Sequence, residues 1–329
     1  MPAESHVLSA FERLLHLKRY PLFIGLPPAD LALVAEYGRE RFFPKGAVLL
    51  REGEPVASVY IVVDGEVSIR RAGRVIGRAA RGAGVGGLGF LARETDGAEA
   101  VAEANTLALE WDADAMLELF EDHFSILHHM LRSVCRDLVH LQIKSGCEWM
   151  PQDAARPSSL PLDRPLDLVE RIFFLRRSAP FLHGSINALA ELSRAVVEMR
   201  FDPGTHLWDE GDTGPSVQLI MEGTVRCRAS TGCEFTAGAG FPLGVVEAMA
   251  ELPRWHDAVT ETRLVTLQGN VEAMLDVFED NFDMAMDYLA AMAKALSLIS
   301  QRVTGTYQTS LGAFYYGYGG QTEPTPAVP

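Results

Sequence analysis

Two stretches of the chain carry apolar residues mostly every three or four positions over more than twenty residues, with one gap in the second stretch. This spacing places the apolar side chains on one face of an amphipathic helix, so each stretch predicts a long helix. The first stretch has its apolar positions at Met116, Leu119, Phe120, Phe124, Leu127, Leu131, Val134 and Leu138. The second stretch has them at Met274, Phe278, Phe282, Leu289, Met292 and Leu296.

Ahead of each predicted long helix, the apolar pattern predicts shorter elements, first helices and then strands. Apolar positions at helical spacing predict two short helices in each half, over residues 11–17 and 28–37, and over residues 169–175 and 186–196. Runs rich in β-branched residues then flank a turn made of an acidic residue and a glycine, which is typical of a β-hairpin. The predicted hairpins cover residues 59–70 and 217–228.

The two halves are copies of one unit. The segment AMLELFEDHF begins at Ala115 and AMLDVFEDNF begins at Ala273, so Phe278 minus Phe120 gives an offset of 158 residues. The same offset relates glycines along the two halves, and this constancy indicates duplicated domains. The pairs are Gly46 and Gly204, Gly65 and Gly223, Gly82 and Gly240, and Gly86 and Gly244.

We expect a first domain over residues 1–145 and a second domain over residues 168–301. Between them, residues 146–167 are rich in Pro, Ser and acidic side chains, a composition typical of a linker. Residues 302–329 are rich in Gly, Tyr and Pro, and we expect a flexible tail there.

Composition and charge narrow the choice of partners. The chain has 44 acidic and 29 basic residues and a net charge of −15, which opposes binding to nucleic acid. No uncharged apolar run is long enough to span a membrane, and the N-terminal residues do not resemble a secretory leader, so we expect a cytoplasmic protein. The four cysteines lack C-x-x-C spacing, which argues against a zinc site and against a disulfide framework.

Four histidines, His123, His128, His129 and His140, fall on the first predicted long helix. No two of them are four residues apart, the spacing that would place two imidazoles on one helix face to hold a metal. We therefore interpret them as part of an exposed helix face and expect no metal site.

The segment RGAGVGGLGF, residues 81–90, contains a literal G-x-G-x-x-G made of Gly82, Gly84 and Gly87. This motif marks a dinucleotide site only where it joins a strand to a helix inside a βαβ unit. No such unit is predicted, and the copy of the segment, AGFPLGVVEA at residues 239–248, breaks the spacing. We conclude that the segment is not a dinucleotide fingerprint.

The segments PKGAVLLREGEPVASVYIVVDGEVSI and DPGTHLWDEGDTGPSVQLIMEGTVRC resemble the front half of a cyclic-nucleotide-binding domain. The resemblance covers nearly the whole of each repeat. It implies an α+β fold of two tandem antiparallel β jelly-roll domains, each with N-terminal helices and a long C-terminal helix.

Members of that family bind the nucleotide through a phosphate-binding cassette resembling G-x-x-F-G-E…(P)-R-A-A. In the first copy, Gly82, Val85 and Gly86 match this cassette. The position of the sugar-binding Glu holds Gly87, which has no side chain to offer the ribose. The position of the phosphate-binding Arg holds Asp96, which would repel a phosphate. The resemblance therefore implies a degenerate site that does not bind cyclic nucleotides.

In the second copy, Gly240, Leu243 and Gly244 match the cassette, and Val245 stands at the position of the Glu. The Arg position holds Arg254, so this copy keeps one polar anchor of two. Two readings of Arg254 remain open. It pairs with the phosphate of a bound cyclic nucleotide, or it is a surface Arg paired with Glu251 or Asp257.

Two further residues of the second copy bear on that choice. Trp255 and His256 replace the two alanines that leave space for the nucleotide in the family, so Trp255 is placed to fill that space. Glu247 lies two residues too late in the sequence for the ribose-binding role.

No P-loop, nucleophile elbow or Ser–His–Asp spacing is present, so we expect no enzyme and no cofactor. The layout is similar to that of a kinase regulatory subunit, or of a bacterial-type regulator without its helix-turn-helix. We expect a non-enzymatic regulatory or adaptor protein that binds a partner protein. The alternative is a regulator responsive to cAMP or cGMP through the second domain, and an enzyme with an unfamiliar site is a third hypothesis. The long helices also suggest a homodimer, unless they pack between the two repeats of one chain.

Overall fold

The computed structural model describes residues 9–18, 20–94, 97–145 and 163–304. Contacts divide the described chain into two compact units. Unit 1 comprises the residues up to Ser133 together with those from Ala293 onward, and unit 2 comprises Val134–Met292. The divisions fall inside the two long helices, so unit 1 takes in the end of the last helix, far along the chain from its other elements, whereas unit 2 is one continuous stretch. Within the described ranges, no helix is long and apolar enough to cross a bilayer.

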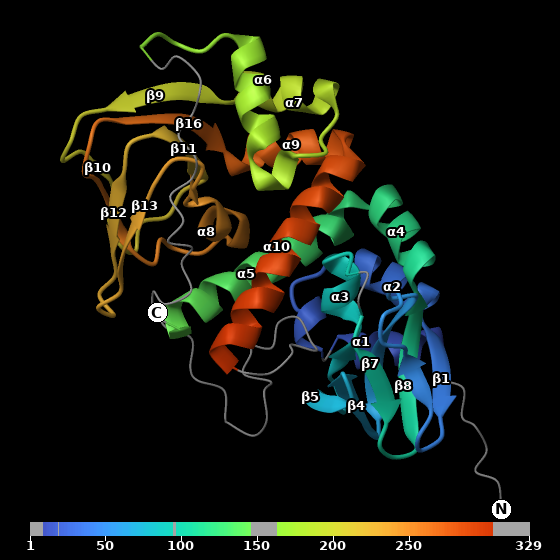
Figure 1. Ribbon diagram of the computed structural model, residues 1–329. Coiled ribbons are helices and arrows are strands. Elements are labelled where there is room, and N and C mark those ends of the chain that lie inside the picture. The colour runs from blue at the N-terminus through green and yellow to red at the C-terminus, as the bar shows by residue number, and fades with distance from the viewer. Residues whose placement is uncertain (1–8, 19, 95–96, 146–162, 305–329) are drawn as a thin grey trace, which may run out of the picture. The chain divides into compact units, whose positions relative to one another are not determined.

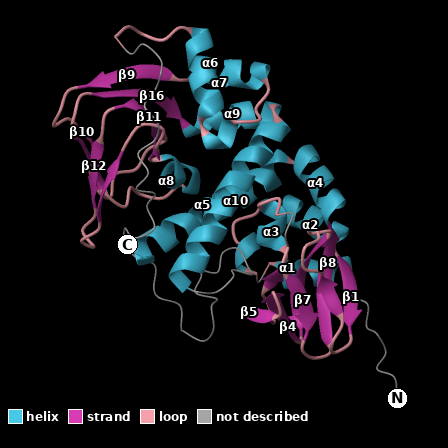
Figure 2. Cartoon of the chain, viewed as in Figure 1, coloured by secondary structure: helices cyan, strands magenta, loops and turns pink. Residues whose placement is uncertain are grey.

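Unit 1 is built from two antiparallel four-stranded sheets flanked by helices (Figure 1, Figure 2). One sheet has the strand order β1-β8-β3-β6 and the other has the order β2-β7-β4-β5. The strands are β1 (Arg39–Phe43), β2 (Val48–Leu50), β3 (Ser58–Asp64), β4 (Glu66–Arg71), β5 (Arg74–Ala80), β6 (Gly84–Val85), β7 (Glu99–Ala102) and β8 (Thr106–Asp112). The helices are α1 (Ala10–Leu17), η1 (Pro21–Phe23), α2 (Pro28–Tyr37), α3 (Gly87–Leu91), α4 (Ala113–Asp122) and α5 (Phe124–Ser145).

Unit 2 repeats the same architecture, with sheets in the orders β14-β11-β16-β9 and β10-β15-β12-β13. The strands are β9 (Val197–Phe201), β10 (His206–Trp208), β11 (Ser216–Glu222), β12 (Val225–Arg228), β13 (Glu234–Ala237), β14 (Pro242–Leu243), β15 (Asp257–Thr260) and β16 (Leu264–Asn270). The helices are α6 (Leu168–Arg177), η3 (Ala179–Phe181), α7 (Ile186–Ala195), α8 (Val245–Ala250), α9 (Val271–Asp280) and α10 (Phe282–Thr304). The predicted α+β fold of two tandem antiparallel jelly rolls is confirmed.

Repeated capping residues explain where equivalent helices begin. Ser9 and Asp167 each accept a hydrogen bond from the backbone N–H of a Glu three residues later, and that Glu accepts one from the backbone N–H of the capping residue. These reciprocal bonds form a capping box, which satisfies backbone donors that a helix start leaves free. At equivalent positions of the two repeats, the side chains of Asp112 and Asn270 cap α4 and α9.

The prediction of one continuous long helix at the end of each repeat is wrong in detail. In unit 1 the helix is interrupted at His123, whose backbone leaves the helical region at φ −133° and ψ 80°. The equivalent Asn281 interrupts the second helix at φ −137° and ψ 75°. The apolar stripe runs across both breaks because Phe124 and Phe282 keep the helical spacing, so periodicity alone does not reveal the interruption.

The hairpin turn of each jelly roll requires glycine. Gly65 and Gly223 have φ values of +100° and +92°, a region that residues with a Cβ rarely adopt. A Cβ on Gly65 would lie 2.7 Å from the carbonyl oxygen of Asn105, and one on Gly223 would collide with the carbonyl oxygen of Arg263. The strand after each turn therefore approaches a neighbouring loop more closely than any larger residue allows.

The cysteines differ from one another in state. Cys135 and Cys227 are buried free thiols, and burial raises the pKa of each thiol well above its ordinary value. Cys233 is disulfide-bonded. The sequence argued against a disulfide framework and did not single out Cys233, because scattered spacing says nothing about which thiols the fold brings together.

Phe278 is fully buried and its ring centroid lies 5.2 Å from that of Tyr288. Replacing Phe278 by Ala leaves a cavity, so Phe278→Ala is expected to lower the free energy of unfolding of unit 2 by about 3–5 kcal/mol. Urea denaturation measures the loss. As a control, Phe11→Ala removes a side chain that is 65% exposed and is expected to change stability by less than about 0.5 kcal/mol. Equal effects of the two variants would contradict the buried placement of Phe278.

Candidate functional site

The glycines that match the family cassette occupy the same turn in both units. Gly82 and Gly240 have φ values of +84° each, and their N–H groups donate to the carbonyls of Val62 and Ile220 at 2.8 and 2.7 Å. This bond fixes the start of the turn on the central strand of its sheet. The repeat therefore keeps the backbone of the cassette turn in both copies.

Gly86 and Gly244 end the turn with φ values of +83° and +80° and stand directly before α3 and α8. Between the glycines, Leu243 lies on β14, pairs with Gln218 of β11 and is buried. Val85 holds the equivalent place on β6, opposite Tyr60. The sequence thus identified a real structural element, whose ligand chemistry depends on the side chains around it.

In unit 2 the guanidinium of Arg254 lies against the backbone of this turn, and the residue as a whole is only 4% exposed. Its Nη1 donates to the carbonyl oxygen of Gly244. Its Nη2 donates to the carbonyl oxygens of Ser216, at 2.5 Å, and of Gly214, at 3.2 Å. The reading of Arg254 as a surface residue paired with Glu251 or Asp257 is therefore wrong. Three backbone carbonyls already occupy donors that a phosphate would need.

Two more contacts hold the Arg254 side chain in place. The guanidinium carbon lies 4.6 Å from the ring centroid of Trp208, a distance at which a cation is attracted to an aromatic face. A Cβ on Gly244 would lie 2.6 Å from Nη1 of Arg254, so the turn packs directly on the guanidinium. Burial lowers the pKa of Arg254, whereas the nearby carboxylates of Glu247 and Asp212 act in the opposite direction.

Aromatic rings fill the space beside Arg254. Trp255 is buried, and its ring centroid lies 5.6 Å from that of Phe235 and 4.8 Å from that of His256. Phe235 in turn lies 6.4 Å from Phe241 and packs against the core of the jelly roll. The two residues that replace the small alanines of the family cassette are therefore both part of a packed aromatic cluster.

Glu247, on α8, is the polar residue whose role the sequence reasoning missed. It is buried, and its Oε1 lies 3.5 Å from Nε2 of His256. Burial acts to raise the pKa of Glu247, but the hydrogen bond and charge of His256, together with the charge of Arg254, outweigh it and lower that pKa. Glu247 thus satisfies a buried histidine. Its offset of two residues from the family position was the available sign that it does not serve a sugar.

In unit 1, Gly87 is the first residue of α3, and a Cβ added there would meet nothing within 4 Å. In unit 2, the equivalent Val245 is buried. Asp96, at the position of the family Arg, lies outside the described residues.

The four histidines do not form a metal site in the part of the chain that the structure describes, where no group of three or more potential ligands is found. The reading of these residues as an exposed helix face is wrong for His129. Its side chain is buried, with Nε2 lying 2.7 Å from the carbonyl oxygen of Leu22. His128 stacks on Phe124 with ring centroids 6.1 Å apart. Both are accounted for by packing.

Comparison with known families confirms the resemblance. Residues 40–123 match the family model of the cyclic nucleotide-binding domain. This range covers the strands of unit 1, the cassette turn and α4. No curated protein matches the chain.

Solved structures of similar proteins include regulatory parts of kinases. The regulatory domain of Toxoplasma gondii PKA with cAMP is 17% identical over 87% of this chain and 96% of that chain, with a TM-score of 0.34. The regulatory subunit of a cAMP-independent protein kinase A from Trypanosoma cruzi, bound to guanosine, is 20% identical over 90% and 93%, with a TM-score of 0.33. A cyclic nucleotide-binding-like protein from Brucella abortus is 26% identical over 33% of this chain and 98% of its own, with a TM-score of 0.29.

Removal of the Arg254 guanidinium would take a charged donor away from the carbonyls of Gly214, Ser216 and Gly244, of which Gly244 keeps the N–H of Ala248. We expect Arg254→Met to lower the free energy of unfolding of unit 2 by about 2–5 kcal/mol in chemical denaturation. The matched control is Arg228→Met, because Arg228 is 58% exposed and pairs with Glu234 at 3.0 Å on the surface. That variant should lose no more than about 1 kcal/mol. If Arg254→Met is as stable as the control, Arg254 does not hold the turn.

Proposed function

We propose that this chain is a non-enzymatic regulatory or adaptor protein that uses tandem cyclic-nucleotide-binding-like domains to bind a partner protein and not a nucleotide. The observation that carries the proposal is the engagement of Arg254 with three backbone carbonyls. A cyclic phosphate would have to displace those carbonyls from a buried cation, and each carbonyl left unpaired costs about 1–3 kcal/mol. The Arg254 guanidinium, which would attract the phosphate, is already hydrogen-bonded to backbone carbonyls.

The surroundings of Arg254 support the same proposal. A nucleotide bound on the cassette of unit 2 would need the volume that Trp255, Phe235 and His256 occupy. Displacing a buried aromatic side chain gives up the burial energy of the largest apolar side chains. In unit 1 a ligand would find neither the carboxylate for the sugar nor, at Asp96, a cation for the phosphate.

The alternative is a regulator that binds cAMP or cGMP through unit 2, with Gly240, Leu243, Gly244, Val245 and Arg254 as the contact residues. The retained turn geometry and the retained cation favour this alternative. It requires the Arg254 side chain to leave Gly214 and Ser216, and Trp255 to leave the aromatic cluster. We rank it second for that reason.

Exposed apolar residues at equivalent positions of the two units support a protein partner. Phe11 and Val169 are 65% and 73% exposed, and they are 158 residues apart. Leu15 and Phe173, also 158 residues apart, are 45% and 48% exposed. Large apolar side chains exposed on a helix face are typical of an interaction surface. We propose that α1 and α6 present the same kind of contact to a partner protein.

The cytoplasmic location and the homodimer both stay predictions. The apolar face of α5 is largely buried within the chain, as Leu131, Val134 and Leu138 show. That burial favours packing inside one chain over packing between two copies.

Calorimetric titration tests the nucleotide part of the proposal. We expect no saturable heat when cAMP or cGMP is added to the full chain up to about 1 mM, a range that reveals any dissociation constant tighter than roughly 100 µM. The alternative predicts micromolar binding that Arg254→Ala abolishes and that Arg228→Ala leaves unchanged. Such a result would contradict the proposal that the chain does not bind a nucleotide and would support the cyclic-nucleotide regulator.

Affinity capture from the native host tests the adaptor part. A partner that contacts α1 and α6 should be retained by the wild-type chain and lost, by at least about tenfold in abundance, with the double variant Phe11→Ser and Phe173→Ser. Val197→Ser removes another exposed apolar side chain, 60% exposed on β9, and should retain the partner. Equal retention by all three proteins would contradict an interaction through these helices.

A further inference from the structure

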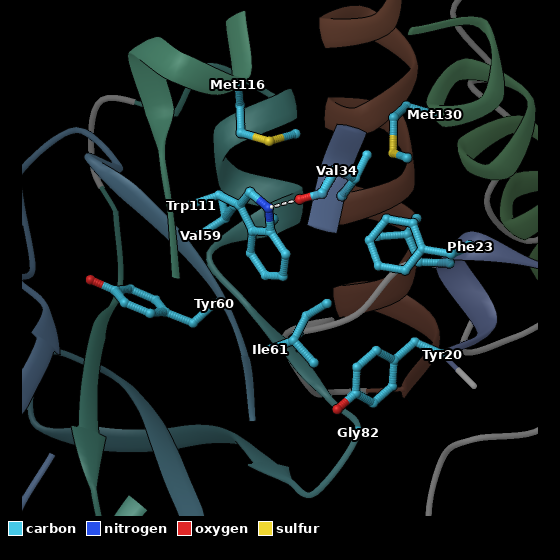
Figure 3. A pocket seen from close by; sticks show the side chains of 13 residues that line it. Tyr20, Phe23, Val34, Val59, Tyr60, Ile61, Gly82, Trp111, Met116 and Met130 are labelled. Atoms are coloured by element: carbon cyan, nitrogen blue, oxygen red, sulfur yellow. Dashed lines mark hydrogen bonds between the residues drawn. The ribbon is translucent and has the colours of Figure 1, made fainter. Parts of the chain in front are cut away.

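Unit 1 contains a cavity of about 80 Å³ beside the cassette turn (Figure 3). Aliphatic, aromatic and thioether side chains line most of it, and three glycines of the segment at residues 81–90 complete the wall. The lining residues are Tyr20, Leu22, Phe23, Val34, Val59, Tyr60, Ile61, Gly82, Gly84, Gly87, Trp111, Met116 and Met130. All of them belong to unit 1.

The cavity lies outside the jelly roll, on the helix side of its sheet. Tyr60 and Val62 belong to the core between the two sheets. Since side chains alternate along a strand, Val59 and Ile61 face the opposite side, toward the helices. Figure 3 shows Ile61 directed toward Tyr20 and Phe23, whereas the hydroxyl of Tyr60 points away from them. The site is therefore distinct from the interior of the barrel.

The polar groups of two large lining residues, Trp111 and Tyr60, already make hydrogen bonds within the protein. Trp111 Nε1 donates to the carbonyl oxygen of Val34 at 2.8 Å, the bond drawn in Figure 3. The hydroxyl of Tyr60 donates to Glu110 Oε1 at 3.0 Å. A cavity that is lined by carbon and sulfur and whose polar neighbours are already bonded favours an apolar occupant over water.

Two lining residues, Gly87 and Met130, are smaller than their equivalents in unit 2, whereas Tyr20 and Trp111 are larger than theirs, Ser178 and Gly269. Gly87 has open volume around its Cβ position, and the equivalent residue in unit 2 is the buried Val245. Met130 corresponds to Tyr288, which is fully packed with its ring 5.8 Å from Phe181 and 5.2 Å from Phe278. The repeat as a whole does not require the cavity, since unit 2 keeps the fold with larger side chains at these positions.

We propose that this cavity is a binding site for a small, uncharged molecule with a single aromatic ring. The faces of Tyr20, Phe23 and Trp111 offer aromatic contacts, and aromatic pairs gain energy beyond simple burial. Met116 and Met130 contribute flexible thioethers that make favourable contacts with ring edges.

The size of the cavity limits the ligand to one ring. A dry cavity of about 150 Å³ in another protein holds benzene, so a site of about 80 Å³ takes a ring only when flexible lining residues yield. The two methionines supply that freedom, because their unbranched side chains adopt several rotamers at small cost. Gly87 begins α3, so a bound ring would touch the cassette helix itself. The site does not depend on the function proposed above.

Fluorobenzene and fluorine NMR test the proposal on the full chain. We expect saturable shifts or broadening of the probe signal, with a dissociation constant on the order of 1 mM for so small a ligand. Gly87→Val introduces the residue that unit 2 carries at this position, into open volume, and should weaken binding by about tenfold or more because its side chain fills the site. Its melting temperature should equal or exceed that of the wild type.

Two further variants make the result decisive. Met130→Tyr introduces the residue of unit 2 at the other divergent position and should also abolish binding, and it serves as the readout if Gly87→Val does not fold. Gly238→Val adds a side chain at an open position in unit 2 and should leave binding unchanged. No saturable binding, or binding that survives both cavity-filling variants, would overturn the proposal. Loss of binding in Gly238→Val would do so as well.

Discussion

The buried guanidinium of Arg254 connects three segments of unit 2. Its donors reach the loop at Gly214, the start of β11 at Ser216 and the cassette turn at Gly244, and it stacks on Trp208 of β10. The backbone of Arg254 adds two bonds, donating to the carbonyl of Asp212 and accepting from the N–H of Gly211, both at 2.8 Å. A charge buried in this way is stable only while its hydrogen bonds are made. The positions of these segments therefore depend on one side chain.

The two repeats depart from the cassette pattern in opposite ways. In unit 2, Arg254 stands at the position of the cation, its guanidinium donates to backbone carbonyls, and Trp255 and His256 pack beside it. In unit 1, Gly87 stands at the position of the sugar-binding Glu, and a Cβ added there would meet nothing within 4 Å. A filled site resists a new ligand, whereas an empty one leaves room for one of different chemistry. The duplicated fold has thus allowed the two copies to diverge without disturbing the common framework.

Much of the fold followed from the sequence, because the repeated glycines and the apolar spacing reflect local backbone geometry. The positive φ of Gly65 and Gly223 is a local requirement of the turn, whereas their close contacts are with Asn105 and Arg263, which lie far from the turns in the sequence. Tertiary features did not follow. The burial of Arg254 and of His129 depends on elements far away in the chain, and the breaks at His123 and Asn281 interrupt the backbone without changing the apolar spacing. Local pattern thus predicted the elements, while the electrostatic state of the site required the three-dimensional structure.

The division of the chain inside its long helices has a consequence for how the protein folds. Residues 293–304 of α10 belong to unit 1, where Ser297 donates a hydrogen bond to Glu94 across 203 positions of sequence. Contacts so distant in sequence form late and slow the search for the native state. During synthesis, the first jelly roll must therefore wait for the last helix before its contacts are complete, and a fragment that ends near residue 145 lacks that helix entirely. Unit 2, in contrast, is one continuous stretch, Val134–Met292, so its contacts can be completed before the last helix is synthesised.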